Sequence, residues 1–341
     1  MTERPASADY LRDLLVGHIP VQLACAMAGL RLADLLADGP MTVEELGAAA
    51  KARPDLLRRL LRGLADIGLV TLDRDDRVAA TELGALLRSS TTGSMRDLAL
   101  YRGGPSYISW GKLEHTVRTG DPAFEAAFGA PFFSYMRDHP EAGAAFDGGM
   151  TRLALGVIDE TLAHYDFSAA KRILDVGGGR GHFAAAVLEA YPQLEGAVLD
   201  VPERIEAANE YLRGRGLGER SLAIGGNFLD SVPEGYDLHI LKWILHDWND
   251  ASCRQLLARC RAALPADGRL LVVELLLPDD AAVDGRLRPA IQADLFMLVN
   301  FADSPERSLD DYERLLGDSG FALEQAIALP SSFNVLDFRP Q

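Results

Sequence analysis

The sequence predicts a doubly wound α/β domain preceded by a helical domain with a winged-helix pattern. Beyond Phe167, short β-type runs alternate with helical segments, which is typical of a parallel sheet with helices on both faces. Residues 10–100 instead carry apolar side chains at helical spacing. A chain of 341 residues, 48% of them hydrophobic, is long enough for two packed cores.

The charge balance argues against several classes of partner. Lysine and arginine number 34 against 50 acidic residues, so the net charge is −16, which repels phosphate backbones and anionic membrane surfaces. We therefore expect neither nucleic acid nor a membrane as a partner. No signal peptide is expected at the N-terminus, and the longest apolar run, 270–277, is interrupted by Glu274. Three cysteines without a CxxC spacing favour a cytoplasmic protein with neither a disulfide framework nor a zinc cage.

Residues 42–80 have the pattern of a winged helix. Thr42 and Glu45 can form a capping box at the start of one helix. Pro54 opens a second helix, and Gly68 suits its C-terminal end. Two short strands, 69–72 and 77–80, are expected to follow, with an acidic turn between them. Helix, turn, helix and β-wing together predict this fold for residues 1–104.

Residues 105–165 are expected to form a helical bridge that also covers a pocket. This segment keeps the helical pattern but is unusually rich in aromatic side chains. They are Tyr107, Trp110, Phe124, Phe128, Phe132, Phe133, Tyr135 and Phe146. The α/β domain then occupies residues 166–341, and its clearest strands are 172–176, 196–200, 238–242 and 269–274.

The first of these strands runs into a glycine loop, 177–181, and then into a helix at 182–191. Glycines permit a ligand to approach the backbone closely, and the helix N-terminus offers free amides. Three interpretations are open: S-adenosylmethionine, a dinucleotide, or a structural turn. Gly179-x-Gly181-x-x-Ala184 also satisfies the dinucleotide fingerprint, with Asp200 at the spacing for a ribose contact. Asp175 favours S-adenosylmethionine, because a carboxylate stabilises a cationic ligand and repels a pyrophosphate.

Five motifs in sequence order give the chain a family likeness. They are Ile173-Leu-Asp-Val-Gly-Gly-Gly-Arg-Gly, Val198-Leu-Asp-Val-Pro, Gly225-Gly-Asn-Phe, Leu241-Lys-Trp-Ile-Leu-His-Asp-Trp-Asn-Asp and Pro305-Glu-Arg-Ser. Together they closely resemble the S-adenosylmethionine-dependent O-methyltransferases of the caffeic acid and isoflavone type. Bacterial members of this family tailor polyketides, phenazines and mitomycin-like compounds. The resemblance covers nearly the whole chain and implies a Rossmann-like methyltransferase domain preceded by a winged-helix dimerisation domain.

The resemblance implies a set of residues that bind S-adenosyl-L-methionine. Gly177, in the loop with Gly179, would contact the methionine part, and Asp200 would bind both ribose hydroxyls. Asn227 and Phe228 would hold the adenine, and Lys242 would contact a cofactor carboxylate or the ribose side. Where this chain has Asn227 the family usually has Asp. Because the amide oxygen still accepts from an amino group, weaker binding is expected rather than loss.

The resemblance also implies a general base, His246, and two orienting carboxylates, Glu274 and Glu306. A phenol of pKa about 10 is a poor nucleophile at neutral pH until an imidazole of pKa near 6.5 takes its proton. A carboxylate at one ring nitrogen fixes the tautomer and stabilises the imidazolium. No metal is required for this reaction. The competing interpretations are a structural histidine, a strand-end ion pair for Glu274 and a solvated loop charge for Glu306.

The acceptor pocket is less clearly marked. Phe146 and Met150, spaced i,i+4, match family residues that wall the acceptor and the cofactor, although such a pair usually belongs to a core. Trp110 and Met297 are weaker candidates, as are Tyr107 and Phe301. An aromatic-rich bridge with few cations predicts a flat, neutral hydroxyarene as the acceptor.

Three other functions remain as alternatives. A winged helix suggests a small-molecule-sensing regulator, but the second helix at 54–66 carries a net charge of only +1, far from a DNA-binding face. Some bacterial relatives have become hydroxylases or decarboxylases, but those lack the base histidine. The glycine loop permits an NAD-dependent oxidoreductase, which the His-Asp-Trp segment does not suggest.

The segment 21–36 predicts a homodimer. It has too few polar positions for a helix with one exposed side, so another surface is expected to cover it. The family resemblance implies that two chains intertwine there.

Overall fold

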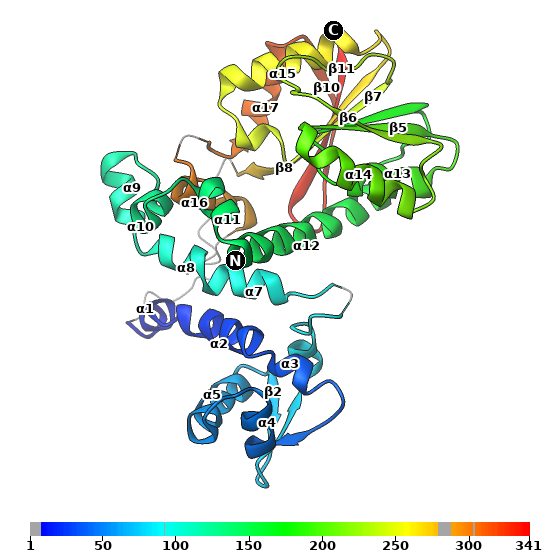
Figure 1. The fold of residues 1–341 in the computed structure, drawn as a ribbon. Coiled ribbons are helices and arrows are strands. Elements are labelled where there is room, and N and C mark those ends of the chain that lie inside the picture. Colours follow the sequence, from blue (N-terminus) through cyan, green and yellow to red (C-terminus); the bar gives the residue numbers. More distant parts are fainter. Residues whose placement is uncertain (1–7, 92, 279–287, 303) are drawn as a thin grey trace. The chain divides into compact units, whose positions relative to one another are not determined.

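The computed structural model describes residues 8–91, 93–278, 288–302 and 304–341 (Figure 1). The chain divides into two compact units, Met1–Leu153 and Ala154–Gln341, and helix α12 (Pro140–His164) spans the border between them. The functional borders expected after residues 104 and 165 stay a prediction. Each unit is described by itself below.

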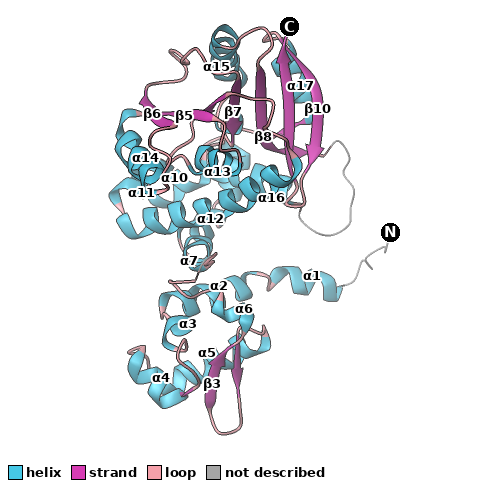
Figure 2. Cartoon of the chain, turned by 90° about the vertical axis from the view of Figure 1, so that its right-hand side faces the viewer, coloured by secondary structure: helices cyan, strands magenta, loops and turns pink. Residues whose placement is uncertain are grey.

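The N-terminal unit begins with a winged helix, as the sequence predicts. Three short strands form an antiparallel sheet in the order β1-β3-β2, packed on helices whose buried side chains include Leu46, Leu61 and Leu64 (Figure 2). The elements are α1 (Ala8–Leu15), α2 (His18–Gly29), α3 (Leu32–Leu35), β1 (Met41–Thr42), α4 (Val43–Ala49), α5 (Pro54–Asp66), β2 (Val70–Leu72), β3 (Arg77–Ala80) and α6 (Glu82–Ala85).

Local sequence signals set the ends of these helices. The Thr42 hydroxyl accepts from the Glu45 amide, and the Glu45 carboxylate accepts from the Thr42 amide, so the predicted capping box is confirmed. Pro54 is the first residue of α5, and Gly68, two residues beyond its end, has φ +77°. A left-handed residue at this place is what glycine permits without strain.

The rest of the N-terminal unit is helical, as expected, and rich in aromatic contacts. Its helices are α7 (Arg96–Gly103), α8 (Pro105–Trp110), α9 (Leu113–Thr119), α10 (Ala123–Phe128), α11 (Phe132–Asp138) and the first part of α12. Phe124 is fully buried and contacts the rings of Phe128, Phe132 and Tyr135. These aromatic side chains therefore build part of this unit's own core.

The C-terminal unit is a doubly wound α/β domain, so the predicted fold class is confirmed. Its main sheet has the order β6-β5-β4-β7-β8-β11-β10, and Figure 2 shows β6 and β10 at opposite edges. The elements are β4 (Arg172–Val176), α13 (His182–Ala190), β5 (Glu195–Asp200), α14 (Pro202–Gly214), β6 (Ser221–Gly225), β7 (Leu238–Lys242), α15 (Asp250–Ala263), β8 (Arg269–Leu277), α16 (Pro289–Asn300), β9 (Arg307–Ser308), α17 (Leu309–Gly317), β10 (Phe321–Ala328) and β11 (Phe333–Pro340).

Alternate residues of the buried strands face two separate helical layers. On β4, Ile173 packs into a cluster with side chains of α12, α13 and α16, whereas Leu174 packs into a second cluster with α15 and α17. Figure 1 shows α13 and α15 on different sides of the sheet. Both faces of the sheet are therefore covered, which is why its strands are hydrophobic without a polar alternation.

The order of the strands indicates the edge of the sheet at which a ligand binds. The chain proceeds from β4 outward to β5 and β6 and then returns to β7 on the other side of β4, and these strands are parallel. In open α/β sheets, ligands bind beyond the carboxyl ends of the strands at such a reversal. The glycine loop follows β4, and the His246 segment follows β7. Among the described helices, none is long and apolar enough to cross a membrane.

Candidate active site

The glycine loop forms a cradle that has no room for a side chain at its first position. Gly177 has φ +73°, and a Cβ there would lie 2.4 Å from Cδ1 of Ile244 and 3.5 Å from Cε1 of Phe228. An L side chain would be strained by this φ and would also displace Ile244. The backbone of the loop is thereby kept bare beside Phe228.

Asp200 ties the end of β5 to this loop. Its Oδ2 accepts from the Gly179 amide at 2.7 Å, and its Oδ1 accepts from the Val201 amide at 2.8 Å. The side chain is 8% exposed, and Arg204 approaches Oδ1 at 3.8 Å. Since a carboxylate has about four lone-pair sites, each oxygen can still accept from a ribose hydroxyl.

Asp175 and Lys242 lie at the carboxyl ends of the two central strands, β4 and β7. Burial raises the pKa of Asp175 to about 6, against the charge of Lys242 and a hydrogen bond from the Ala184 amide at 3.3 Å. Burial lowers the pKa of Lys242, while the charges of Asp175 and Glu274 oppose that change. The charge of each of these two groups therefore stabilises the charged form of the other at the ends of the central strands.

Asn227 and Phe228 follow β6 on the same edge. Asn227 is exposed, and its Oδ1 accepts from the Leu229 amide at 3.0 Å, which closes the turn. The ring of Phe228 meets Trp248 edge-on, with centroids 5.8 Å apart and planes at 84°. Trp248 is a further aromatic side chain at this edge, which the sequence motif contained but which we did not single out.

Together these residues fit S-adenosylmethionine. A bare glycine backbone permits close approach, Asp200 can accept from ribose hydroxyls, and the Phe228 ring supplies an apolar surface for a base. The buried carboxylate of Asp175 suits a cationic ligand better than a pyrophosphate. These protein groups are complementary to a nucleoside with a positively charged tail.

His246 lies beyond the end of β7, on the 3-10 turn Leu245–Asp247. Its Nδ1 is 2.9 Å from Oε1 of Glu306, so the buried carboxylate fixes the tautomer with a proton on Nδ1. In the neutral ring, the lone pair of Nε2 is then available to accept a proton. Asp247 lies on this other side, with Oδ1 3.4 Å from Nε2.

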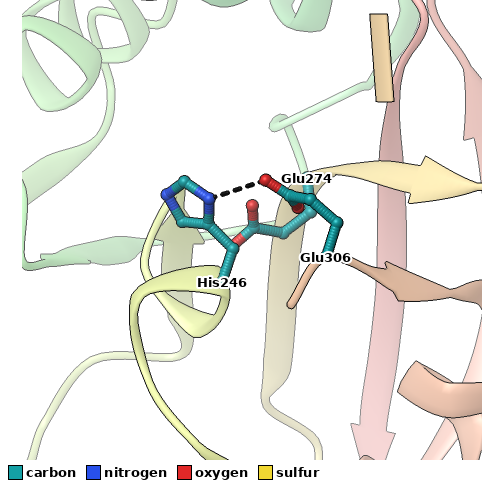
Figure 3. Close-up of side chains that lie close together, drawn as sticks. All are labelled: His246, Glu274 and Glu306. Carbon is teal, nitrogen blue, oxygen red and sulfur yellow. Dashed lines mark hydrogen bonds and ion pairs between the residues drawn. The ribbon is translucent and has the colours of Figure 1, made fainter. Parts of the chain in front are cut away.

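Glu274 forms its hydrogen bonds with the turn and acts on the imidazole through its charge. Oε1 of Glu274, at 0% exposure on β8, accepts from the amides of Ile244 and Leu245, each at 3.0 Å. A ring nitrogen of His246 and one carboxylate oxygen each of Glu274 and Glu306 lie within 4.8 Å of one another. Both carboxyl groups are on the same side of the ring (Figure 3). The structure therefore brings together all three residues proposed for catalysis, but only Glu306 binds the ring.

The acidic neighbours control the charge of the imidazole. Burial by itself would lower the pKa of His246, but the charges of Glu274 and Asp247 and the hydrogen bond with Glu306 raise it to about 9. Burial raises the pKa of Glu274, with the imidazolium opposing that change. The site is thus built to hold a proton on the imidazole.

The four residues proposed for acceptor binding are not brought together within one unit. Trp110 lies on α8, and Phe146 and Met150 lie on α12, all in the N-terminal unit, whereas Met297 is buried on α16 of the C-terminal unit. Phe146 contacts the rings of Tyr101 and Phe132 at 5.2 and 4.9 Å. These contacts give Phe146 a packing role within its own unit, and its acceptor role stays a prediction.

Two residues beside the base were not singled out from the sequence. Asp294 of α16 accepts from the Glu306 amide at 3.1 Å, and Arg307 donates to backbone carbonyls on both sides of His246. The one available signal was the position of Arg307 directly after Glu306 in the Pro305-Glu-Arg-Ser motif. The contacts of Arg307 do not follow from local spacing, since they join segments about sixty residues apart in the chain.

Comparison with known proteins matches both parts of the chain to family models. Residues 13–90 match an O-methyltransferase dimerisation domain, and residues 110–322 match an O-methyltransferase domain. Phenazine O-methyltransferase PhzM of Lysobacter antibioticus is 38% identical over 98% of this chain and 96% of its own length. Phenazine-1-carboxylate N-methyltransferase of Pseudomonas aeruginosa is 32% identical over 95% of each chain.

Solved structures match this chain over nearly its whole length. The crystal structure of LaPhzM has a TM-score of 0.89 at 37% identity and covers 98% of this chain and 99% of its own. The structure of NcsB1, an O-methyltransferase from neocarzinostatin biosynthesis, contains S-adenosylmethionine and 2-hydroxy-5-methyl naphthoic acid. It has a TM-score of 0.78 at 32% identity, over 94% of this chain and 96% of that one.

Proposed function

Because the chain belongs to the O-methyltransferase family and is an S-adenosylmethionine-dependent methyltransferase, we propose that it methylates a hydroxyl group on a small aromatic molecule of secondary metabolism, with His246 as the general base. The observation that carries the choice of base is the hydrogen bond between Nδ1 of His246 and buried Glu306, on the sheet edge that also bears the glycine cradle. It leaves Nε2 as the atom that accepts the proton.

Each residue has a defined task in this reaction. S-adenosylmethionine supplies a methyl group on a sulfonium, an electrophile that needs no further activation. Nε2 of His246 removes the proton from the acceptor hydroxyl as the oxygen forms its bond to the methyl carbon, and the carbon–sulfur bond breaks to leave a neutral thioether. Glu306 and Glu274 stabilise the imidazolium, and proton transfer of this kind contributes about 10²–10⁴ in rate.

The winged helix gives little support to a regulator. The Arg58 side chain of α5 is paired with Glu44 and with Asp76, and Arg53 is paired with Asp55. Cations that are already paired with carboxylates offer little to a phosphate backbone. We therefore infer that this region serves dimerisation, as in its family, and that nucleic acid is not a partner.

A set of acceptors tests the proposal directly. The purified protein is incubated with S-adenosylmethionine and hydroxyphenazines, hydroxynaphthoates or aminohydroxybenzoates, and the products are identified by mass spectrometry and NMR. Methyl transfer to an aromatic oxygen is the expected result. Transfer only to nitrogen, or hydroxylated or decarboxylated products, would contradict it, as would binding of NADH or DNA in place of S-adenosylmethionine.

The first prediction concerns Asp200. Replacement by Ala removes the acceptor for the ribose hydroxyls and releases the Gly179 amide, so S-adenosylmethionine should bind about 1.5–3 kcal/mol more weakly, the range for hydrogen bonds to a charged group. Isothermal titration calorimetry measures this loss. Glu203→Ala, at an exposed carboxylate three residues away, is the matched control and should bind normally. Equal affinity of Asp200→Ala and wild type would show that this loop binds something else.

The second prediction concerns the homodimer that we propose. Helix α1 buries none of its residues, and Leu11, Leu14 and Leu15 are 57%, 57% and 69% exposed. Apolar side chains clustered in this way mark an interaction surface, and they coincide with the start of the matched dimerisation domain. Leu14→Asp with Leu15→Asp should convert the dimer into a monomer in light scattering.

The control for this experiment is Val117→Asp on α9, which changes a side chain that is 71% exposed outside the matched dimerisation domain. It should leave the dimer intact. A wild-type protein that is monomeric and active at micromolar concentration would contradict the proposal. The three cysteines are free thiols, which fits the cytoplasmic location that we propose.

A further inference from the structure

The base is carried by a turn that has little stability of its own. The turn Leu245–Asp247 makes two internal hydrogen bonds, from the Asp247 amide to the Ile244 carbonyl at 3.2 Å and from the Trp248 amide to the Leu245 carbonyl at 3.3 Å. Both are at or beyond the long end of the range for good N–H···O bonds. A single 3-10 turn also has poorer hydrogen-bond geometry than an α-helix. Side chains from elsewhere must hold it in place.

Two buried side chains of opposite charge hold the two ends of this turn. At its start, Oε1 of Glu274 accepts from the Ile244 and Leu245 amides. At its end, Nη1 of Arg307 donates to the Leu245 carbonyl at 2.7 Å, and Nη2 donates to the Trp248 carbonyl at 2.8 Å. A carboxylate at the amide end and a guanidinium at the carbonyl end both match the polarity of the peptide groups.

Arg307 is itself fixed. The residue is 5% exposed, and Oδ1 of Asp250 accepts from its Nη2 at 2.9 Å and its Nε at 3.2 Å. The preceding residue, Glu306, holds the imidazole. Glu306 and Arg307 are therefore consecutive residues with two tasks: Glu306 holds the ring of His246, and Arg307 holds the backbone on both sides of it.

We propose that Arg307 is a positioning residue for the base: its guanidinium fixes the carbonyl end of the His246 turn, so that the imidazole stays on Glu306 with Nε2 directed toward the acceptor. The inference rests on the proposed role of His246. Lysine cannot replace Arg307, because a single ammonium lacks the planar fork that reaches two carbonyls and a carboxylate at once.

Arg307→Lys tests this role while keeping the positive charge. Because misplacement of a catalytic group by about 1 Å can cost about 10²-fold, we expect kcat to fall about 10- to 100-fold, with the Kd for S-adenosylmethionine within about twofold of wild type. The imidazole should also lose part of its contact with Glu306. Its pKa should then move down, toward the usual value of about 6.5.

NMR titration of the His246 ring, assigned with His246→Asn, measures that second effect without any methyl transfer. The acidic groups that face the ring, Glu274, Glu306 and Asp247, all remain in the variant, so a downward shift reports displacement rather than a lost charge. A merely structural arginine would change thermal stability and leave the titration where it is. If the wild type transfers no methyl group but the titration still shifts, the positioning role stands and the proposed function falls.

Arg254 provides a matched control. It is half-exposed, and its Nη2 lies 3.7 Å from the other oxygen of Asp250, on the side away from the atoms that bind Arg307 in the part of the chain that the structure describes. Arg254→Lys should keep the wild-type kcat and the wild-type titration of His246. If Arg307→Lys does not fold, Asp250→Asn weakens the same clamp from its other side and should lower kcat about two- to fivefold with a downward shift of the His246 pKa. A folded Arg307→Lys, or failing that a folded Asp250→Asn, with unchanged kcat and unchanged titration would overturn the inference.

Discussion

His246→Ala should lower kcat for methylation of an aromatic hydroxyl by about 10²–10⁴, the range for loss of a general base. The reason lies in the acceptor: a phenol of pKa about 10 is almost wholly protonated at neutral pH, and without an imidazole its proton has to leave to water. Binding of S-adenosylmethionine should change little, because its proposed contacts lie on the glycine loop, on Asp200 and beside Phe228. Single-turnover rates combined with calorimetry separate the two effects.

His164→Ala is the control for that variant, because His164 is an exposed histidine on α12 whose Nδ1 lies 2.8 Å from the Glu160 carbonyl oxygen of its own helix. It should keep the wild-type rate. An acceptor with a more acidic hydroxyl should be less sensitive to His246→Ala, since more of it is already ionised. A rate close to wild type for His246→Ala on a weakly acidic phenol would refute the assignment of the base.

The parts of the fold that local sequence determines were predicted well. The Thr42 capping box, the start of α5 at Pro54 and the central strands β4, β5, β7 and β8 depend on neighbouring residues, and all are present. The strand β6 and the antiparallel pair β10 and β11 were not predicted. These are edge strands of the parallel array or strands added beside β8. The apolar run of β6 is only three residues long, and β10 carries Glu324 and Gln325 in its middle, so neither shows the long hydrophobic run that identifies a buried strand.

The candidate site was only partly predictable, because its contacts join segments that are distant in the sequence. The family resemblance made Asp200, His246, Glu274 and Glu306 candidates, but the partner that each side chain contacts depends on how distant segments meet. Glu274 was expected to flank the imidazole; one of its carboxylate oxygens lies within 4.8 Å of a ring nitrogen of His246, and its hydrogen bonds go to two backbone amides of the turn. Arg307 could not be assigned a task from its sequence neighbours, because its contacts lie about sixty positions earlier in the chain.

The rate should depend steeply on pH, with its acid limb well above the usual range for histidine. Burial lowers the pKa of His246, but the charge of Glu274, the hydrogen bond with Glu306 and the charge of Asp247 outweigh burial and raise it to about 9. Below that value the ring already carries a proton and cannot take another. Neutral imidazole is then about 1% of the total at pH 7 and about half at pH 9, so kcat/KM for the free enzyme should rise about fiftyfold over that interval.

Glu306→Gln should shift the acid limb back toward lower pH and thereby tests the cause of the raised pKa of His246. Without that carboxylate the imidazolium is less stabilised, so the pKa of His246 should fall and the acid limb should move to lower pH, even though looser orientation of the ring lowers the maximal rate. Bound S-adenosylmethionine should act in the same direction, because its positive sulfonium disfavours a second cation nearby, whereas the neutral S-adenosylhomocysteine should not. NMR titration of the His246 ring in the free protein and in the two complexes measures these shifts separately from catalysis. An acid limb near pH 6.5 in the wild type that stays in place in Glu306→Gln would show that the acidic neighbours of His246 do not raise its pKa.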